Sequence, residues 1–401
     1  MKNDGIYDVA VVGAGPAGLA AALGISREGA KVAVIGPQAD PSDNRTAALF
    51  TGSLQLLRNL GAWEECSGAG TPLLAIRIID DMGALLRAPE VSFTAAEVGL
   101  DAFGSNIPNV VLTQALRRRA AARASLTLLE TSVTNVDIGP ASVDLRLADG
   151  SSLNARLLIG ADGRKSLCRS AAGIGTRAWA YEQSALTCTF AHQRPHAGIS
   201  TEFHRPAGPL TVVPSPGRTS SLVWVDRPAI AQRLAGLDET AFRGALETRL
   251  QGLLGPVGEI RPRAVFPLSG LVALSAARNR VALVGEAAHV IPPIGAQGLN
   301  LGLRDAALIA DCVGEALRLG GDIGSPQTLE RYARARRLDI VTRAWSIDVL
   351  NRSLISGFLP VQLLRGLGLH ALKAIGPLRR LAIREGLAPS YVAPSLMREA
   401  P

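Results

Sequence analysis

The stretch from residue 280 to residue 305 carries residue types that could bind a ligand where a strand meets a helix. Residues 281–284 form a short apolar run that predicts a buried strand, and helical spacing begins at Leu299. Backbone N–H groups in the first turn of a helix lack internal partners and carry partial positive charge, which favours an anionic or electron-rich ligand edge. Gly295 and Gly298 would let such a ligand approach the main chain closely.

A second stretch, near the N-terminus, has the spacing of a dinucleotide-binding fingerprint. Residues 7–12 predict a strand, Gly13, Gly15 and Gly18 follow at once, and residues 19–35 predict a helix and a second strand. In such a βαβ unit the glycines permit a tight turn, bring a pyrophosphate close to the helix N-terminus and let the helix pack on the strand. The stretch therefore predicts a nucleotide site.

One residue of that fingerprint is missing. An acidic residue at the end of the second strand normally binds the ribose hydroxyls of the dinucleotide. Gly36 stands at this position, and the nearest polar candidates are Gln38 and Asp40. The sequence leaves open how the ribose is held.

A third stretch presents Asp162 and Gly163 after the apolar residues 157–160, which predict a buried strand. Ligands of open α/β sheets bind at the carboxyl ends of the strands. A plain turn would also explain an Asp-Gly pair, but basic residues follow it: Arg164, Lys165 and Arg169. These charges favour a loop that handles an anion.

The other segments predict a doubly wound parallel sheet with an inserted antiparallel sheet. Helical patterns cover residues 45–61, where Arg45 could face phosphate or solvent, and residues 110–123. Strands are expected at 75–80, 126–129, 133–138 and 143–148, and four more between 184 and 225. The expected domains are a discontinuous nucleotide-binding domain (1–74, 100–180 and 266–330), a substrate domain (75–99 and 181–265) and a helical C-terminal segment (331–401).

Composition excludes several classes of protein. A chain of 401 residues with 47% hydrophobic and 19% charged residues can bury one large or two medium cores. The four cysteines are scattered and no histidine has a convincing ligand spacing, so neither a disulfide framework nor a metal site is expected. The beginning of the chain shows no signal peptide. We therefore expect a cytoplasmic protein.

The net charge of +8 comes entirely from residues 331–401, which hold twelve basic residues against four acidic ones. Apolar residues alternate with the basic ones, without the interleaved aromatics that nucleic-acid binding would favour. The pattern fits two interpretations equally well. One is a helical cap with a solvated basic face, and the other is peripheral contact with the anionic inner face of the cytoplasmic membrane.

In this order, the three stretches resemble the motifs of the single-component FAD-dependent aromatic hydroxylases, which have the para-hydroxybenzoate hydroxylase fold. The resemblance spans about residues 7 to 390 and is strongest toward the ubiquinone-biosynthesis hydroxylases, through residues 298–305, residues 45–49 and the basic C-terminal helices. Two positions depart from the family pattern: Glu286 replaces the usual Asp, and Gly36 replaces the usual Glu.

The resemblance implies a role for each motif residue toward FAD. Gly13, Gly15 and Gly18 would bind the pyrophosphate, Arg45 and Gln114 the FAD backbone, and Glu286 the ribityl chain. Asp162 and Gly163 would serve both FAD and the nicotinamide donor. The N–H groups of Gly298, Leu299 and Asn300 would face the N1/O2 edge of the flavin, and the carbonyl of Pro293 would lie near its C4a side.

The resemblance also implies a reaction. Flavin reduced by NAD(P)H would react with O₂ to give a C4a-hydroperoxide that hydroxylates an aromatic ring, most simply a polyprenylated phenol of ubiquinone biosynthesis in a biosynthetic complex. Two alternatives stay open: the same chemistry on a soluble aromatic or secondary metabolite, and a non-catalytic flavin-binding scaffold. Ring position, electron donor and oligomeric state do not follow from the sequence.

Overall fold

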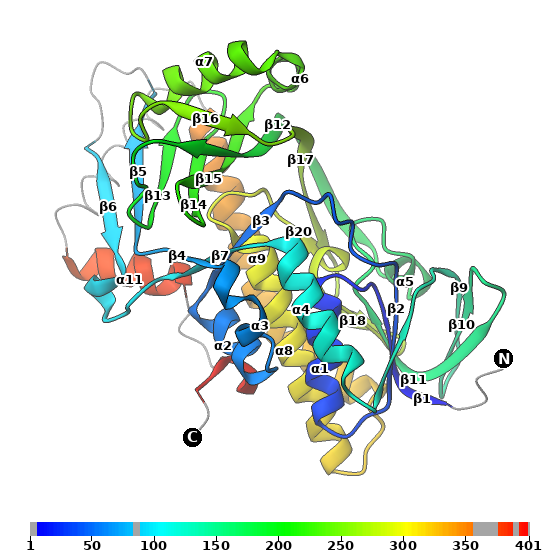
Figure 1. The fold of residues 1–401 in the computed structure, drawn as a ribbon. Coiled ribbons are helices and arrows are strands. Elements are labelled where there is room, and N and C mark those ends of the chain that lie inside the picture. Colours follow the sequence, from blue (N-terminus) through cyan, green and yellow to red (C-terminus); the bar gives the residue numbers. More distant parts are fainter. Residues whose placement is uncertain (1–5, 83–88, 356–375, 388–392, 400–401) are drawn as a thin grey trace.

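The structure is a computed structural model that describes residues 6–82, 89–355, 376–387 and 393–399 (Figure 1). The described residues form two large sheets and a small third sheet that lies between them (Figure 1). The first large sheet has the order β18-β19-β11-β1-β2-β8, and β9 and β10 continue it from β11. Its strands are β1 (Tyr7–Val12), β2 (Val32–Ile35), β8 (Leu126–Leu129), β9 (Val133–Ile138), β10 (Val143–Leu147), β11 (Ser152–Gly160), β18 (Ala277–Arg278) and β19 (Val281–Leu283).

The first sheet has the parallel centre that the sequence predicts. β1 pairs in parallel with both β2 and β11, and β11 pairs in parallel with β19. Apolar side chains of β1 face helices on one side and the β9–β10 ribbon on the other, so both faces are buried. The covering helices are α1 (Pro16–Arg27), α4 (Asn109–Ala121) and α8 (Gln297–Arg318) on one face and α5 (Leu167–Ala171) on the other.

The second sheet has the order β20-β17-β12-β15-β14-β13-β5-β6, with β16 paired to β12. Its strands are β5 (Ala75–Asp80), β6 (Val91–Thr94), β12 (Thr176–His192), β13 (Ile199–His204), β14 (Leu210–Ser215), β15 (Thr219–Asp226), β16 (Val257–Ile260), β17 (Ala264–Ala273) and β20 (His289–Val290). It is not purely antiparallel as expected, because β13 and β5 pair in parallel. Two helices cover it, α6 (Pro228–Gly236) and α7 (Glu239–Leu250) (Figure 1).

One predicted helix is wrong in its first turn. Residues 46–50 form strand β3 (Thr46–Phe50) instead, and only then does α2 (Thr51–Asn59) begin. β3 pairs antiparallel with β7 (Gly104–Pro108), which also pairs with β4 (Thr71–Pro72). This ladder satisfies the backbone of an apolar run that would otherwise suit a helix. The short helices α3 (Trp63–Cys66), η1 (Ser67–Ala69) and η2 (Ala95–Val98) complete this region.

The C-terminal segment is helical where the structure describes it. α9 (Pro326–Ile355) and α11 (Gly376–Leu387) are followed by the short η4 (Ser395–Met397), and η3 (Gly285–Ala287) lies earlier, after β19. Buried Tyr332 on α9 donates a hydrogen bond to the carbonyl of Leu283, so α9 is anchored to the first sheet. Part of the predicted amphipathic pattern, residues 356–375, lies outside the described residues. The division of the chain into domains stays a prediction.

Within the described ranges, none of the helices combines the length and hydropathy needed to cross a bilayer.

Candidate active site

The three glycine-containing stretches meet at the carboxyl ends of β1, β2, β11 and β19. A cleft of about 600 Å³ opens there between the first sheet and the second. Its walls come from the turn after β1 (Ala14, Gly15, Pro16), from residues 37–45, and from the second sheet (Thr187, Cys188, Arg263, Ala264, Phe266). The nucleotide fingerprint therefore faces a cavity and not the core.

The three positions after β1 are occupied by glycine for different local reasons. Gly13 has φ +118°, and a Cβ there would lie 2.1 Å from the carbonyl oxygen of Ala161. A Cβ on Gly18 would lie 2.0 Å from the carbonyl oxygen of Gly13. Gly15, by contrast, has no atom within 4 Å of such a Cβ, and it lines the cleft. Gly13 and Gly18 are thus required by packing, while Gly15 leaves room for a ligand to approach the backbone.

The Asp162-Gly163 turn follows β11 and its backbone lies close to Gly13, but the carboxylate of Asp162 already accepts hydrogen bonds from the protein. Its Oδ1 accepts a hydrogen bond from Ser166 Oγ at 2.6 Å, and its Oδ2 accepts one from the N–H of Cys168 at 3.1 Å. The carboxylate therefore caps α5. The prediction that Arg169 handles an anion is wrong, because Arg169 is buried and donates to the carbonyls of Ala287 and Arg164.

The stretch from residue 280 to residue 305 packs against the helix that follows the nucleotide fingerprint. A Cβ on Gly302 of α8 would lie 3.1 Å from the Cα of Gly285 and 3.4 Å from the Cβ of Ala17 on α1. This close approach brings η3, α1 and α8 together. Glu286, the next residue along η3, is exposed, and its charge adds to the effect of Asp43 in raising the pKa of Arg45.

The N-terminus of α8 is held by one side chain. Asn300 is buried; its Oδ1 accepts from the N–H of Phe50 and from Ser53 Oγ, at 2.9 and 2.8 Å. Its Nδ2 donates to the carbonyls of Ala48 and Ala296 at 2.8 and 2.7 Å. Ala296, in the N-cap position, has φ +53° and contributes no side-chain cap. The half-buried Gly298 and Leu299 follow, so the first turn keeps backbone donors for a ligand.

Of the remaining predicted site residues, Arg45 lines the cleft, whereas Gln114 and Pro293 are not among its lining residues. Arg45 lines the cleft and forms two hydrogen bonds with Asp43, at 2.8 and 2.9 Å, which raise its pKa. Gln114 is exposed on α4, next to Thr113, which lines the cleft. Pro293 is exposed in the loop before α8.

The sequence reasoning missed a buried ionic network beneath the site. Asp305 accepts hydrogen bonds from the N–H of Gly285 at 2.9 Å, from His289 Nε2 at 2.6 Å and from Arg336 Nε at 2.5 Å. Arg336 also pairs with Asp339 at 2.6 Å. Arg304 and Arg343 pair with the same Asp339, at 2.8 and 2.9 Å, and Arg343 reaches Gln297 at 2.6 Å. The network links α9 to η3 and to the first residue of α8.

Electrostatics keep Asp305 ionised despite complete burial. Burial alone would raise the pKa of Asp305, but the charge of Arg336 and the hydrogen bonds that Asp305 accepts outweigh it, and the pKa lies below its usual value. The partners lie 16 to 31 residues away, so no local pattern marks the network. Two of the basic residues that we assigned to a solvent or membrane face, Arg336 and Arg343, belong instead to the interior.

The other titratable groups show no competing chemistry. The four cysteines are free and buried, and burial raises the pKa of Cys188 to about 12. In the described part of the chain, no cluster of His, Cys, Asp and Glu could hold a metal ion. The candidate binding elements are the cleft beside Gly15 and the first turn of α8, which has no side-chain cap.

This fold and site define a flavoprotein of the para-hydroxybenzoate hydroxylase type. A protein-family profile described as "FAD binding domain" matches residues 6–346. The crystal structure of p-nitrophenol 4-monooxygenase from Pseudomonas putida DLL-E4 superimposes with a TM-score of 0.79 over 96% of this chain and 99% of that one, at 19% identity. That likeness concerns the fold alone.

Curated relatives narrow the class. Ubiquinone hydroxylase UbiL of Rhodospirillum rubrum is 36% identical over 99% of this chain and 94% of its own length. The 3-demethoxyubiquinol 3-hydroxylase of Escherichia coli is 31% identical over 95% of this chain and 98% of its own. The chain belongs to the family of FAD-dependent aromatic hydroxylases, close to those of ubiquinone biosynthesis. Its cofactor is FAD, with NAD(P)H as the electron donor typical of the family.

The residues present fit FAD. Gly15 offers an open backbone edge for a pyrophosphate, and the cleft beside it has the volume for an extended nucleotide. The first turn of α8 has backbone N–H groups without a side-chain cap, which suit a ring edge that becomes negative on reduction. Membership in a family of enzymes also favours catalysis over a non-catalytic scaffold.

Proposed function

We propose that this chain hydroxylates the aromatic ring of a polyprenylated phenol in ubiquinone biosynthesis. The names of the two curated relatives support the pathway. The observation that supports a substrate with a hydrocarbon tail is an apolar cluster beside the N-terminus of α8. Its buried members are Phe50, Leu73, Ala95, Phe103 and Ile383, and Ala296 packs against it. A substrate ring near Ala296 would have an apolar neighbour suited to a hydrocarbon tail.

The cofactor-binding roles assigned by resemblance are part of this proposal. Gly13, Gly15 and Gly18 shape the turn for the pyrophosphate, Arg45 and Gln114 approach the FAD backbone, and Glu286 accepts hydrogen bonds from ribityl hydroxyls. Gly298, Leu299 and Asn300 direct N–H groups toward the flavin ring. Asp162 and Gly163 border the same site, and the carbonyl of Pro293 faces the substrate side. Bound FAD would supply the redox chemistry: reduced by NAD(P)H, it would activate O₂, of which one oxygen atom enters the ring and the other leaves as water.

The protein's own contribution is to position the ring and to exclude water. The four hydrogen bonds of Asn300 fix β3 and α2 against the first turn of α8. This rigid junction orients the donors before the cofactor binds, so less reorganisation is needed during the reaction. The apolar cluster, which includes Ile383 of α11, limits access of water from the substrate side.

Deletion of the gene tests the proposal. Mass spectrometry of the lipid extract should then show a ubiquinone precursor that lacks one ring hydroxyl, and the identity of that precursor would name the ring position. Unchanged ubiquinone with no accumulated precursor would contradict the pathway and favour a soluble aromatic substrate.

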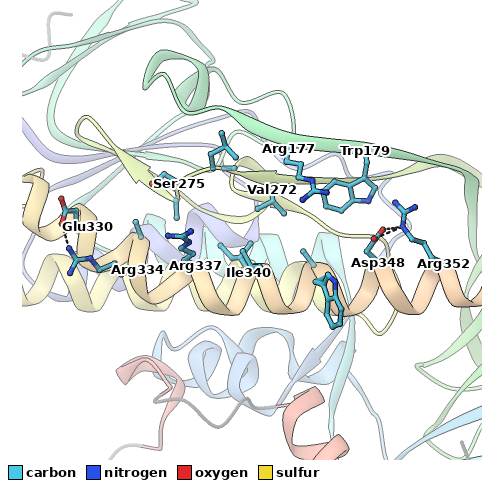
Figure 2. Close-up of a pocket in the computed structure, with 17 residues that line it drawn as sticks. Arg177, Trp179, Val272, Ser275, Glu330, Arg334, Arg337, Ile340, Asp348 and Arg352 are labelled. Atoms are coloured by element: carbon cyan, nitrogen blue, oxygen red, sulfur yellow. Dashed lines mark hydrogen bonds and ion pairs between the residues drawn. The ribbon is translucent and has the colours of Figure 1, made fainter. Parts of the chain in front are cut away.

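We further propose peripheral contact with an anionic membrane through α9. Four apolar residues on its surface repeat at helical spacing: Leu338, Val341, Trp345 and Val349. Leu338 and Trp345 are each 65% exposed. Figure 2 shows the adjoining groove, about 510 Å³, between α9 and strands β12 and β17. Apolar and basic side chains together on one surface are typical of an interfacial helix.

The basic residues of this surface favour contact with a lipid membrane over contact with an apolar surface of another protein. Arg177 and Arg337 line the groove, and neither has an ion-pair partner in the part of the chain that the structure describes. Arg334 and Arg352 line it too, but they are paired with Glu330 and Asp348 (Figure 2). Unpaired arginines beside exposed apolar side chains fit phosphate headgroups above acyl chains.

Vesicle flotation tests the contact. The holoprotein should float with vesicles containing phosphatidylglycerol and not with phosphatidylcholine vesicles, and a Val341→Ser/Trp345→Ser variant should lose flotation. Leu319→Ser, which removes a 77% exposed side chain at the end of α8, is the matched control and should bind normally. Equal flotation of the double variant and the wild type would contradict this surface.

A further inference from the structure

The end of β2 has no space for the acid that usually binds a dinucleotide ribose. In βαβ nucleotide folds this acid follows the second strand. A Cβ on Gly36 would lie 2.6 Å from the backbone N of Ala14 and 2.9 Å from its Cβ. Any side chain at position 36 would therefore displace the turn that carries the glycine fingerprint. The acid has to come from another element if the ribose is to have a charged partner.

The neighbouring strand provides one. β8 runs parallel to β2 with Ile35 beside Leu129, and the N–H of Gly36 donates to the carbonyl of Leu129 at 3.0 Å. Glu130 directly follows Leu129, so it stands at the same edge of the sheet as Gly36, one strand spacing, about 5 Å, away.

Gln38 connects this carboxylate to the cleft. Its Nε2 donates to both oxygens of Glu130, each at 2.9 Å, although 92 residues separate them. Gln38 also lines the cleft together with Ala14 and Gly15. Its own Oε1 has no hydrogen-bond partner among the described residues. An acceptor is therefore free at the cleft edge, beside an amide whose orientation is already set.

Arg117 of α4 also holds the carboxylate, by an ion pair with Glu130. The hydrogen bonds from Gln38 and Arg117 hold the pKa of Glu130 below its usual value, so the group is a carboxylate at neutral pH. Two carboxylate oxygens offer about four lone-pair sites, so Glu130 can keep both protein partners and still accept from a ligand hydroxyl.

We infer that Glu130 and Gln38 together hold the adenosine ribose of FAD, in place of an acid at position 36. The vicinal hydroxyls of the ribose donate to Gln38 Oε1, which lies at the edge of the cleft, and to the Glu130 carboxylate, which Gln38 contacts directly. The pair also favours a ribose that carries free hydroxyls over one that carries a phosphate, because a second anion would face the carboxylate. The inference rests on FAD binding and not on the identity of the hydroxylated substrate.

The test is FAD affinity of the apoprotein, measured by flavin fluorescence quenching, with a second ligand, FAD that lacks both adenosine ribose hydroxyls. Glu130→Gln should weaken FAD binding by roughly tenfold or more, the range expected for a lost hydrogen bond to a charged group, and Gln38→Leu, which removes a neutral acceptor, by roughly two- to tenfold. Both variants should bind the dideoxy analogue as the wild type does. Glu65→Gln is the matched control, since Glu65 pairs with Arg118, the neighbour of Arg117 on α4.

Unchanged FAD affinity in both variants would overturn the inference and leave Glu130 as a surface ion pair. An equal loss of affinity for FAD and for the dideoxy analogue would also overturn it, because the defect would then not involve the hydroxyls. Should Glu130→Gln disturb folding, as judged by the melting temperature of the apoprotein, Gln38→Leu decides alone, since Gln38 is exposed. Neither outcome depends on turnover, so a wrong substrate assignment would not affect the result.

Discussion

Arg336 Nε donates to Asp305 Oδ1 at 2.5 Å, and both side chains are almost completely buried. The pair joins α9 to α8 beneath the proposed flavin site. Because the other oxygen of Asp305 accepts from Gly285 and His289, the same carboxylate also holds the loop that carries Glu286. A basic residue of the C-terminal segment thus supports the cofactor-binding loop from the inside.

Arg336→Met should destabilise the fold by about 3 to 5 kcal/mol, since it removes the buried cation that pairs with both Asp305 and Asp339. Chemical denaturation at neutral pH measures the effect, and FAD content after purification should fall as well. Arg334→Met removes an exposed arginine two residues away that pairs with Glu330, and it should change little. Equal effects of the two substitutions would argue against the network.

The ion pair between Arg379 and Glu97 should make stability depend on acid pH. Hydrogen bonds from Arg379 lower the pKa of Glu97 to about 2, from a usual value of 4.5. The stabilisation is therefore fully present above pH 4.5 and is lost as the pH falls toward 2. Urea unfolding of wild type and Glu97→Gln should differ at pH 7, and the difference should shrink across that window. A difference independent of pH would show that the charge of Glu97 is not involved.

Two glycines of the fingerprint should respond differently to an added methyl group. Gly13→Ala should destabilise the apoprotein, because the new Cβ meets the carbonyl of Ala161 and φ is positive. Gly15→Ala should leave the melting temperature of the apoprotein nearly unchanged and weaken FAD binding, since its Cβ enters open space in the cleft. Calorimetric melting and FAD titration of both variants check this, and normal FAD affinity in Gly15→Ala would contradict the placement of the pyrophosphate.

Glu286→Ala should weaken FAD retention without a loss of folding stability. The carboxylate is exposed on η3 and forms no hydrogen bond among the described residues, so its removal should cost the fold little, while the proposed contact with the ribityl chain would be lost. Absorbance of bound flavin after dialysis measures retention, with Glu64→Ala on α3, away from the cleft, as the control. Full retention in Glu286→Ala would mean that the ribityl chain has another partner.

Local patterns predicted the parts of this molecule that depend on neighbours in sequence. The strand before Gly13, the helix after it and the loop before Leu299 are all set by glycine spacing and apolar runs, and they appear as expected. The first turn expected at residues 46–50 failed because β7, more than 50 residues later, offers a pairing edge. Arg336 with Asp305, and Gln38 with Glu130, are likewise partners distant in sequence, and nothing next to either residue indicates the other.

The most direct test of the proposed reaction uses purified holoprotein, NAD(P)H and two phenols presented in detergent micelles. One carries a polyprenyl chain and the other is the soluble para-hydroxybenzoate. The account predicts that the prenylated phenol stimulates O₂ consumption and becomes one oxygen atom heavier, while hydroxybenzoate stays unchanged. Equal turnover of both phenols, or product from hydroxybenzoate alone, would contradict it.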